Sequence, residues 1–141
     1  MSVKTLEGEN TSLGWSTQKK GTVLYVFTPA CHWCKSNLNN IKSLAATQSD
    51  GYRFVGLSLT DKNLKEYLDR EHLPFPAFIA TDRKAIIELR LGSTPQTLVI
   101  LPSGKVAINI TGAYKGKLLA EVENFFSVHL PGALPLENNG F

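Results

Sequence analysis

The segment TVLYVFTPACHWCKSNLNNIKSLA, residues 22–45, contains the two cysteines of the chain, Cys31 and Cys34, in the spacing CxxC. The apolar, β-branched residues 22–28 predict a strand, and Pro29 ends it just before the first cysteine. Both thiols are therefore expected at a strand-to-helix junction, where helix-terminal N–H groups stabilise a thiolate. The segment predicts a redox-active dithiol.

The apolar residues after the motif recur at intervals of three and four, which predicts a helix over residues 31–46 (Leu38, Ile41, Leu44 and Ala45). Cys31 is expected at the start of this helix and Cys34 about one turn later. A disulfide between them closes a very small loop, so it restricts the unfolded chain little. Its expected use is chemical.

The CxxC spacing also occurs in zinc sites and in structural disulfides. Structural zinc sites take four ligands, but the chain has no second cysteine pair, and His32, His72 and His129 are scattered. A structural disulfide in a domain of this length would be expected to join distant segments. Dithiol redox chemistry is favoured over both, and neither a metal nor a cofactor is expected.

Composition and charge indicate one globular domain. The chain has 141 residues, is 43% hydrophobic and has a formal net charge of +3, with dispersed lysines, so nucleic acid is not a favoured partner. We expect a single domain over residues 1–130 and a loosely held tail over 131–141. Residues 1–21 contain no apolar stretch that could serve in a signal peptide, and no run is long enough to cross a bilayer. As written the chain is expected to be soluble, although a removed signal or membrane anchor would leave the same sequence.

In the rest of the chain, predicted strands and helices first alternate, and a hairpin and a helix then follow. Strand composition over residues 52–59 completes a β-α-β unit, and the last third contains a hairpin and a closing helix. Beyond that unit, helices are predicted over 61–72, 82–89 and 115–128, and short strands over 77–80, 97–101 and 106–110. This order predicts an α/β fold with a mixed sheet and helices on both faces.

Together with STPQT at residues 93–97, these features resemble the thioredoxin fold. The strand and helix expected over residues 73–92, which plain thioredoxin lacks, make the chain more similar to the TlpA/ResA-like thiol-disulfide oxidoreductases. The resemblance covers residues 21–126. It implies a three-layer fold with a central mixed sheet, helices on both faces and a strand-helix insertion of the TlpA/peroxiredoxin type.

The resemblance also implies an activity and a site. Cys31 matches the attacking thiol and Cys34 the resolving thiol of disulfide exchange with a protein substrate. Pro95 matches the family's cis-proline, and Thr94 would offer backbone groups to an extended substrate segment. Trp33 would form an apolar rim for substrate, or would only pack. The family implies a reductant in an extracytoplasmic space, with an upstream redox partner and a possible membrane anchor outside this chain.

The chain departs from the family's pattern next to the thiols. Tyr25 stands where thioredoxin has a buried carboxylate, and Asn37 stands where TlpA/ResA-like proteins often have a glutamate. Ala30 replaces a common tryptophan, and Trp33 occupies a position that is commonly proline. An amide can form a hydrogen bond but cannot take up the proton of the resolving thiol as a carboxylate does. Between the thiols, His32 either tunes the pKa of the Cys31 thiol or is a solvated surface residue.

Two alternative functions stay open at this point. A peroxidase of the peroxiredoxin type shares the fold, and Thr28 stands three residues before Cys31 as in that family's Thr-x-x-Cys, but Leu24 replaces the expected proline. A redox-silent module of the same fold would bind a peptide or a metal through Thr94, Pro95 and Trp33. Both are ranked below exchange.

Overall fold

The strand predicted over residues 22–28 is present in the interior of the sheet. The computed structural model describes residues 1–15 and 17–136, and β3 (Gly21–Phe27) lies inside its sheet, with a strand on each side and all seven residues buried. A strand covered on both faces needs apolar residues at successive positions, which is what residues 22–27 supply. The continuous apolar run therefore reflects burial on both faces.

Seven strands form one mixed sheet within the described residues, in the order β2-β1-β5-β4-β3-β6-β7. β3 is parallel to β4 and antiparallel to β6, and β4 is parallel to β5. The other strands are β1 (Ser2–Lys4), β2 (Asn10–Ser12), β4 (Tyr52–Ser58), β5 (Ala77–Ala80), β6 (Gln96–Ile100) and β7 (Val106–Thr111). The predicted α/β fold class is confirmed.

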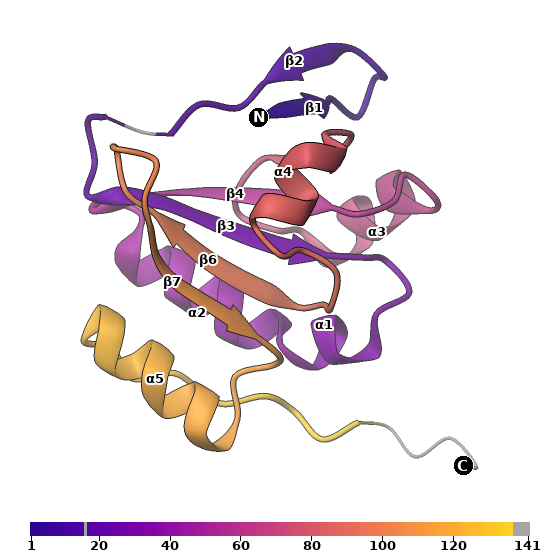
Figure 1. The fold of residues 1–141 in the computed structure, drawn as a ribbon. Helices are drawn as coiled ribbons and strands as arrows, with labels where there is room; N and C mark the ends of the chain where they lie inside the picture. Colours follow the sequence, from indigo (N-terminus) through magenta and orange to yellow (C-terminus); the bar gives the residue numbers. More distant parts are fainter. Residues whose placement is uncertain (16, 137–141) are drawn as a thin grey trace.

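Helices cover both faces of the sheet, which gives three layers (Figure 1). One face carries Val23, Tyr25 and Phe27 of β3 and packs with side chains of α2 (Leu38–Gln48), α3 (Leu64–Glu71) and α5 (Gly116–Phe126). The opposite face carries Leu24 and Val26 and packs against α4 (Arg83–Glu88). None of the helices in the described part of the chain has the length and apolarity that a membrane crossing requires.

The amino-terminal hairpin was not predicted. β1 pairs with β2 and also extends the sheet beside β5, with Val3 opposite Ala80 and 1% exposed. Each strand has three residues, and Val3 of β1 is the single apolar residue among the six. So short a segment gives almost no periodic pattern of apolar residues. The pairing with β5 comes from residues more than seventy positions away, so only the folded chain reveals it.

The predicted continuous helix over residues 31–46 is wrong at one point. The structure has a short α1 (His32–Ser36), then Asn37, then α2. The Asn37 N–H donates to both Trp33 O and Cys34 O, and its side chain turns into the core. The spacing of apolar residues continues across Asn37, so the sequence pattern does not reveal the break between the two helices.

The carboxyl-terminal tail differs from the expected loose extension over the part that is described. Three tail N–H groups donate to the body of the protein, from Gly132 to Asn40 Oδ1 (2.8 Å), Ala133 to Tyr114 O (2.9 Å) and Leu134 to Ser36 O (3.0 Å). These bonds hold residues 132–134 beside α1 and α2. Residues 137–141 of the predicted tail lie outside the described part.

Candidate active site

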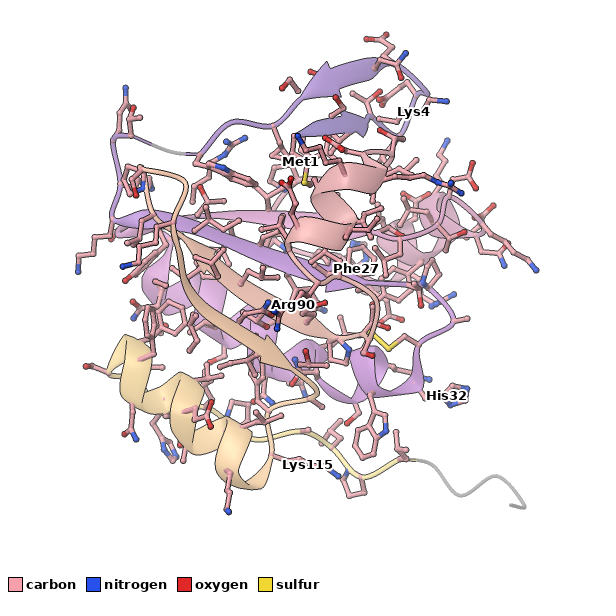
Figure 2. The ribbon with its side chains drawn as sticks, in the orientation of Figure 1. Met1, Lys4, Phe27, His32, Arg90 and Lys115 are labelled. Carbon is pink, nitrogen blue, oxygen red and sulfur yellow. A yellow bond between two sulfur atoms is a disulfide. The ribbon has the colours of Figure 1, made fainter. Side chains whose placement is uncertain are left out.

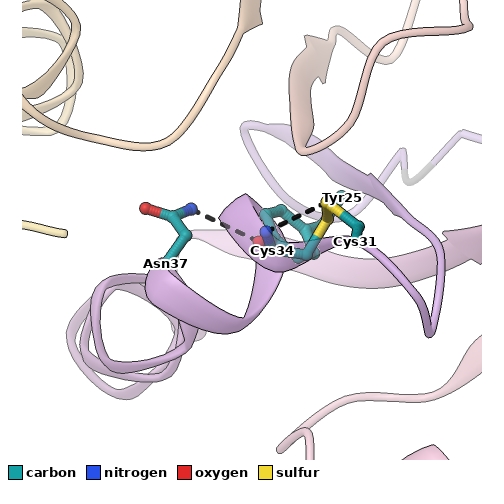
Figure 3. Close-up of a disulfide and its surroundings, with 4 residues drawn as sticks. All are labelled: Tyr25, Cys31, Cys34 and Asn37. Atoms are coloured by element: carbon teal, nitrogen blue, oxygen red, sulfur yellow. Dashed lines mark hydrogen bonds between the residues drawn. A yellow bond between two sulfur atoms is a disulfide. The ribbon is translucent and has the colours of Figure 1, made fainter. Parts of the chain in front are cut away.

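Cys31 and Cys34 lie at the carboxyl end of β3 and form a disulfide in the first turn of α1 (Figures 2 and 3). Cys31 is the N-cap residue, with extended backbone, and Cys34 is inside the helix. The Cys34 N–H donates to Cys31 Sγ at 3.0 Å. A helix N-terminus leaves such N–H groups without intrahelical acceptors, so the same donor can stabilise a Cys31 thiolate once the disulfide opens.

The two sulfurs differ in access. Cys34 is 0% exposed and belongs to the main core cluster, whereas Cys31 is partly exposed and lines a surface cavity. Exchange requires an attacking thiolate that can reach the partner's sulfur. The geometry therefore suits Cys31 for attack and Cys34 for resolution from within.

The Thr94–Pro95 segment lies at the same end of the sheet. β6 runs antiparallel to β3 with Gln96 opposite Val26, so the two residues before Gln96 lie at the carboxyl end of β3. The Thr94–Pro95 peptide bond is cis. Pro95 is buried, and its carbonyl accepts the Gly112 N–H at 2.8 Å.

Trp33 and Thr94 line one surface hollow together with the start of α5. The ammonium of Lys115 lies 4.0 Å from the centre of the Trp33 ring, a cation-π contact that fixes the ring's position. His32, by contrast, is exposed, and its side chain points away from the sheet (Figure 2). Of the predicted site residues, the structure thus brings Trp33 and Thr94 together and leaves His32 at the outer surface.

A buried polar network lies behind the disulfide. The Asn37 amide donates to the Tyr25 hydroxyl at 3.3 Å (Figure 3), and Asn37 Oδ1 accepts from Asn40 Nδ2 at 3.0 Å and from the Tyr114 N–H at 2.8 Å. Asn40 Nδ2 also donates to the Tyr114 carbonyl at 3.1 Å. The hydroxyls of Tyr114 and Thr97 are hydrogen-bonded to each other.

Sequence reasoning identified Tyr25 and Asn37 but missed Asn40, Tyr114 and Thr97. One local signal was present, because Asn37 and Asn40 stand three residues apart on the apolar face of the predicted helix. Two amides at core positions require buried hydrogen-bond partners. Which partners they find depends on the β7–α5 loop, far away in the sequence.

The tyrosines of this region are neutral at physiological pH. Burial raises the pKa of Tyr25 well above its usual value, and the nearby Tyr114 adds to this. Burial likewise raises the pKa of Tyr114, and burial together with the Glu71 carboxylate raises the pKa of Tyr67 to about 12. The hydroxyls of Tyr25 and Tyr114 therefore hold their protons in the neutral pH range.

These pKa shifts predict a loss of stability at alkaline pH. Tyrosines of the unfolded chain ionise near pH 10, while the folded chain keeps these protons, so the unfolded state binds fewer protons above that pH. The free energy of unfolding should be level below about pH 9 and then fall by roughly 1.4 kcal/mol per pH unit for each such tyrosine. Denaturant titrations between pH 7 and 12 measure this.

Tyr67→Phe should make the alkaline loss shallower, because one of the contributing groups is removed. Tyr52→Phe is the matched control, since Tyr52 is only partly buried at the start of β4. Equal alkaline slopes for wild type and both variants would contradict the assignment to Tyr67.

Known proteins resemble this chain over most of its length. Residues 1–108 match the model of the AhpC/TSA family. A thioredoxin-like protein of Haemophilus influenzae is 28% identical over 115 residues, which are 79% of this chain and 66% of that protein. The match thus spans just under two thirds of the relative's length.

Solved structures share the whole architecture. StoA from Bacillus subtilis has a TM-score of 0.66 at 21% identity, covering 91% of this chain and 96% of that chain. A putative thiol:disulfide interchange protein DsbE from Chlorobium tepidum has a TM-score of 0.71 at 15% identity, covering 90% and 91%. A secreted disulfide oxidoreductase of Mycobacterium tuberculosis has a TM-score of 0.67 at 17% identity, covering 90% and 94%. At these identities the likeness establishes the thioredoxin-like fold.

Proposed function

Because the chain belongs to the AhpC/TSA family and has a thioredoxin-like fold with a CxxC pair, we propose that it reduces disulfides of protein substrates by exchange through Cys31 and Cys34. The observation that carries the proposal is the asymmetry of the two sulfurs. Cys31 is accessible and receives a backbone N–H, while Cys34 is buried one turn behind it.

The reaction begins with the reduced protein. The Cys31 thiolate attacks one sulfur of the substrate disulfide, that S–S bond breaks, and the departing sulfur leaves as a thiolate and takes up a proton. Cys34, after losing its proton, attacks Cys31 Sγ and displaces the second substrate sulfur. The substrate gains two electrons and two protons, and the protein ends as the Cys31–Cys34 disulfide. An upstream dithiol partner then returns it to the reduced form.

The neighbouring residues have proposed roles in holding the substrate. Thr94, next to Pro95, offers backbone groups to an extended segment in the manner of strand addition. Trp33, held beneath Lys115, forms an apolar wall on the same side. Trp33 is inside the motif and Thr94 lines the same hollow, so a substrate sulfur at Cys31 brings its chain past them.

Neither Tyr25 nor Asn37 supplies a carboxylate that could receive the proton of Cys34. Asn37 and Tyr25 orient hydrogen bonds there without ionising in the neutral range. We infer that solvent or the leaving substrate thiolate accepts this proton. The reduction of substrate should then depend on pH mainly through the cysteines themselves.

The proposed setting is extracytoplasmic. The support is the likeness to a structure described as that of a secreted disulfide oxidoreductase, together with a CxxC pair that forms a disulfide. The proposed partners are protein substrates that carry disulfides or thiols, and a redox partner upstream.

His32 is proposed to tune the redox potential. A protonated imidazole beside the motif would stabilise the Cys31 thiolate and thus the reduced state. Because His32 is exposed, solvent screening keeps the effect small. His32→Ala should therefore make the disulfide less oxidising, by roughly twofold to fivefold in the equilibrium constant.

Redox titration against glutathione buffers at pH 7 measures this equilibrium constant. His129→Ala is a matched control, because His129 pairs with Glu123 at 3.2 Å, outside the CxxC motif. No change for His32→Ala, or a shift toward a more oxidising disulfide, would refute the role.

A thiol peroxidase is the second candidate, favoured by Thr28 three residues before Cys31 in a chain of this family. A single assay separates the two functions. The protein is supplied with a dithiol reductant and either insulin or hydrogen peroxide. Exchange predicts reduction of insulin without peroxide, whereas a peroxidase consumes the reductant only when peroxide is added. Peroxide-dependent turnover without insulin reduction would overturn the proposal.

A further inference from the structure

A groove separate from the Trp33 hollow opens at Cys31. It has a volume of about 420 Å³, within the range of ligand sites. Its walls are the start of α1, α3 and the carboxyl-terminal segment 134–136. Cys31 lies in the wall, so whatever fills the groove is next to the reactive sulfur.

The tail supplies an apolar wall. Leu134 and Leu136 line the groove and are 53% and 40% exposed, which is high for leucine side chains held against a folded body. The Leu134 N–H donates to Ser36 O, and the Ser36 hydroxyl donates back to the Leu134 carbonyl. These two bonds pin the segment to the end of α1, so the leucines are presented from a fixed backbone.

The α3 wall contains a hydroxyl without a partner. Tyr67 is 2% exposed and lines the groove, and its oxygen has no hydrogen-bond partner among the described residues. Its ring is fixed by stacking on Phe27, with ring centres 5.4 Å apart, and by Arg70 at 5.7 Å. A buried hydroxyl without a partner is unfavourable, and a small side-chain movement on binding would let a ligand carbonyl satisfy it.

The charge left over in the groove is positive. Glu71 accepts a 2.8 Å hydrogen bond from Arg70, so these two charges offset each other. Lys35 of α1 makes no ion pair within the described residues and is exposed beside Cys31. A carboxylate near the reactive sulfur of a substrate would therefore meet an unpaired ammonium.

We propose that this groove binds the chain of a protein substrate on one side of its reactive cysteine, and selects segments with an apolar side chain and a carboxylate there. The apolar side chain packs on Leu134 and Leu136, the carboxylate faces Lys35, and a backbone carbonyl accepts from Tyr67. The inference rests on the proposed exchange at Cys31, in which the substrate sulfur and Cys31 Sγ form the transient disulfide.

Short peptides with one cysteine, joined by a disulfide to 2-mercaptoethanol, test this selection. Leucine and glutamate both follow the cysteine in the first peptide, leucine and lysine in the second, and serine and glutamate in the third, and a second set places each pair before the cysteine instead. The full-length reduced protein is mixed with each peptide, and its oxidation is followed by mass spectrometry. Each rate constant is divided by that for bis(2-hydroxyethyl) disulfide, a neutral reagent with no side chains to fill the groove.

The leucine-glutamate peptide should react about tenfold faster than the serine peptide and roughly threefold to fivefold faster than the lysine peptide. Lys35→Glu should reverse the charge preference, while Lys4→Glu, in the amino-terminal hairpin at the top of Figure 2, should keep it. The double variant Leu134→Ser, Leu136→Ser should lose the leucine preference. Leu6→Ser, an exposed leucine at 43% outside the groove, is its control.

Tyr67→Phe provides a readout that a purely structural role would not give. It removes an unpaired buried hydroxyl, so the free energy of unfolding should not fall, yet the normalised peptide rate should drop about fivefold. Equal normalised rates for all peptides, in a protein that reacts with bis(2-hydroxyethyl) disulfide, would overturn the groove while leaving exchange intact. No reaction with the neutral reagent would instead overturn the proposed function.

Discussion

Replacing Cys31 with serine should abolish reduction of insulin, lowering turnover by at least about 10³-fold, because the accessible nucleophile is gone. Cys34→Ser should lose turnover as well, but by a different route. Its Cys31 still attacks substrate, and without the second sulfur the mixed disulfide is not resolved. Non-reducing electrophoresis and mass spectrometry should therefore detect a covalent adduct for Cys34→Ser and none for Cys31→Ser.

The chain supplies its own controls, because Cys31 and Cys34 are its only cysteines. The double serine variant should form no adduct with any disulfide. An adduct on Cys34 in the Cys31→Ser protein would reverse the two assigned roles, which is not expected for a sulfur that is 0% exposed. Absence of adducts in every variant would favour a redox-silent binding module.

Asn37→Ala should produce the largest loss of stability among the polar substitutions near the site. The Asn37 side chain accepts from the Tyr114 N–H and the Asn40 amide and donates to the Tyr25 hydroxyl. Asn37 is 0% exposed. Alanine leaves buried polar groups without a partner, at about 1–3 kcal/mol each where solvent does not replace the bond. Because Asn40 Nδ2 keeps its bond to the Tyr114 carbonyl, we expect a total loss of roughly 3 kcal/mol.

Asn39→Ala is the matched control two residues away. Asn39 is exposed on α2, and alanine has the higher helix propensity, so stability should change by no more than about 0.5 kcal/mol. Both variants are compared in the disulfide form, by urea unfolding at pH 7. Similar midpoints for the two would show that the amide of Asn37 does not hold the network together.

Prediction from the sequence succeeded where contacts are local or where burial is continuous. Residues 22–28 predicted β3 because every position is apolar or β-branched, and the hairpin of β6 and β7 followed from the turn residues between two apolar runs. Prediction failed where the local structure of a few residues depends on contacts with residues far away in the sequence. The three-residue strand β1 pairs with β5, and Asn37, which stands between α1 and α2, accepts through its side chain from the Tyr114 N–H.

The candidate site divides in the same way. CxxC after an apolar strand was enough to predict the dithiol, because the cysteines and the helix start lie within four residues. The cation-π contact of Lys115 on Trp33 and the groove lined by Leu134 and Leu136 were not predicted. Those contacts join residues separated by more than eighty positions, and no spacing rule relates them.

What the sequence alone determined is the pair of sulfurs, its place at the end of a buried strand, and the α/β architecture around it. These follow from periodicity and short-range geometry, which any stretch of chain carries by itself. Only the tertiary structure decided which sulfur is accessible, which hydrogen bonds surround the buried one, and that the tail forms a wall beside the other. Access and hydrogen-bond partners depend on packing between distant segments, as when Gly132 donates to Asn40 across 92 positions.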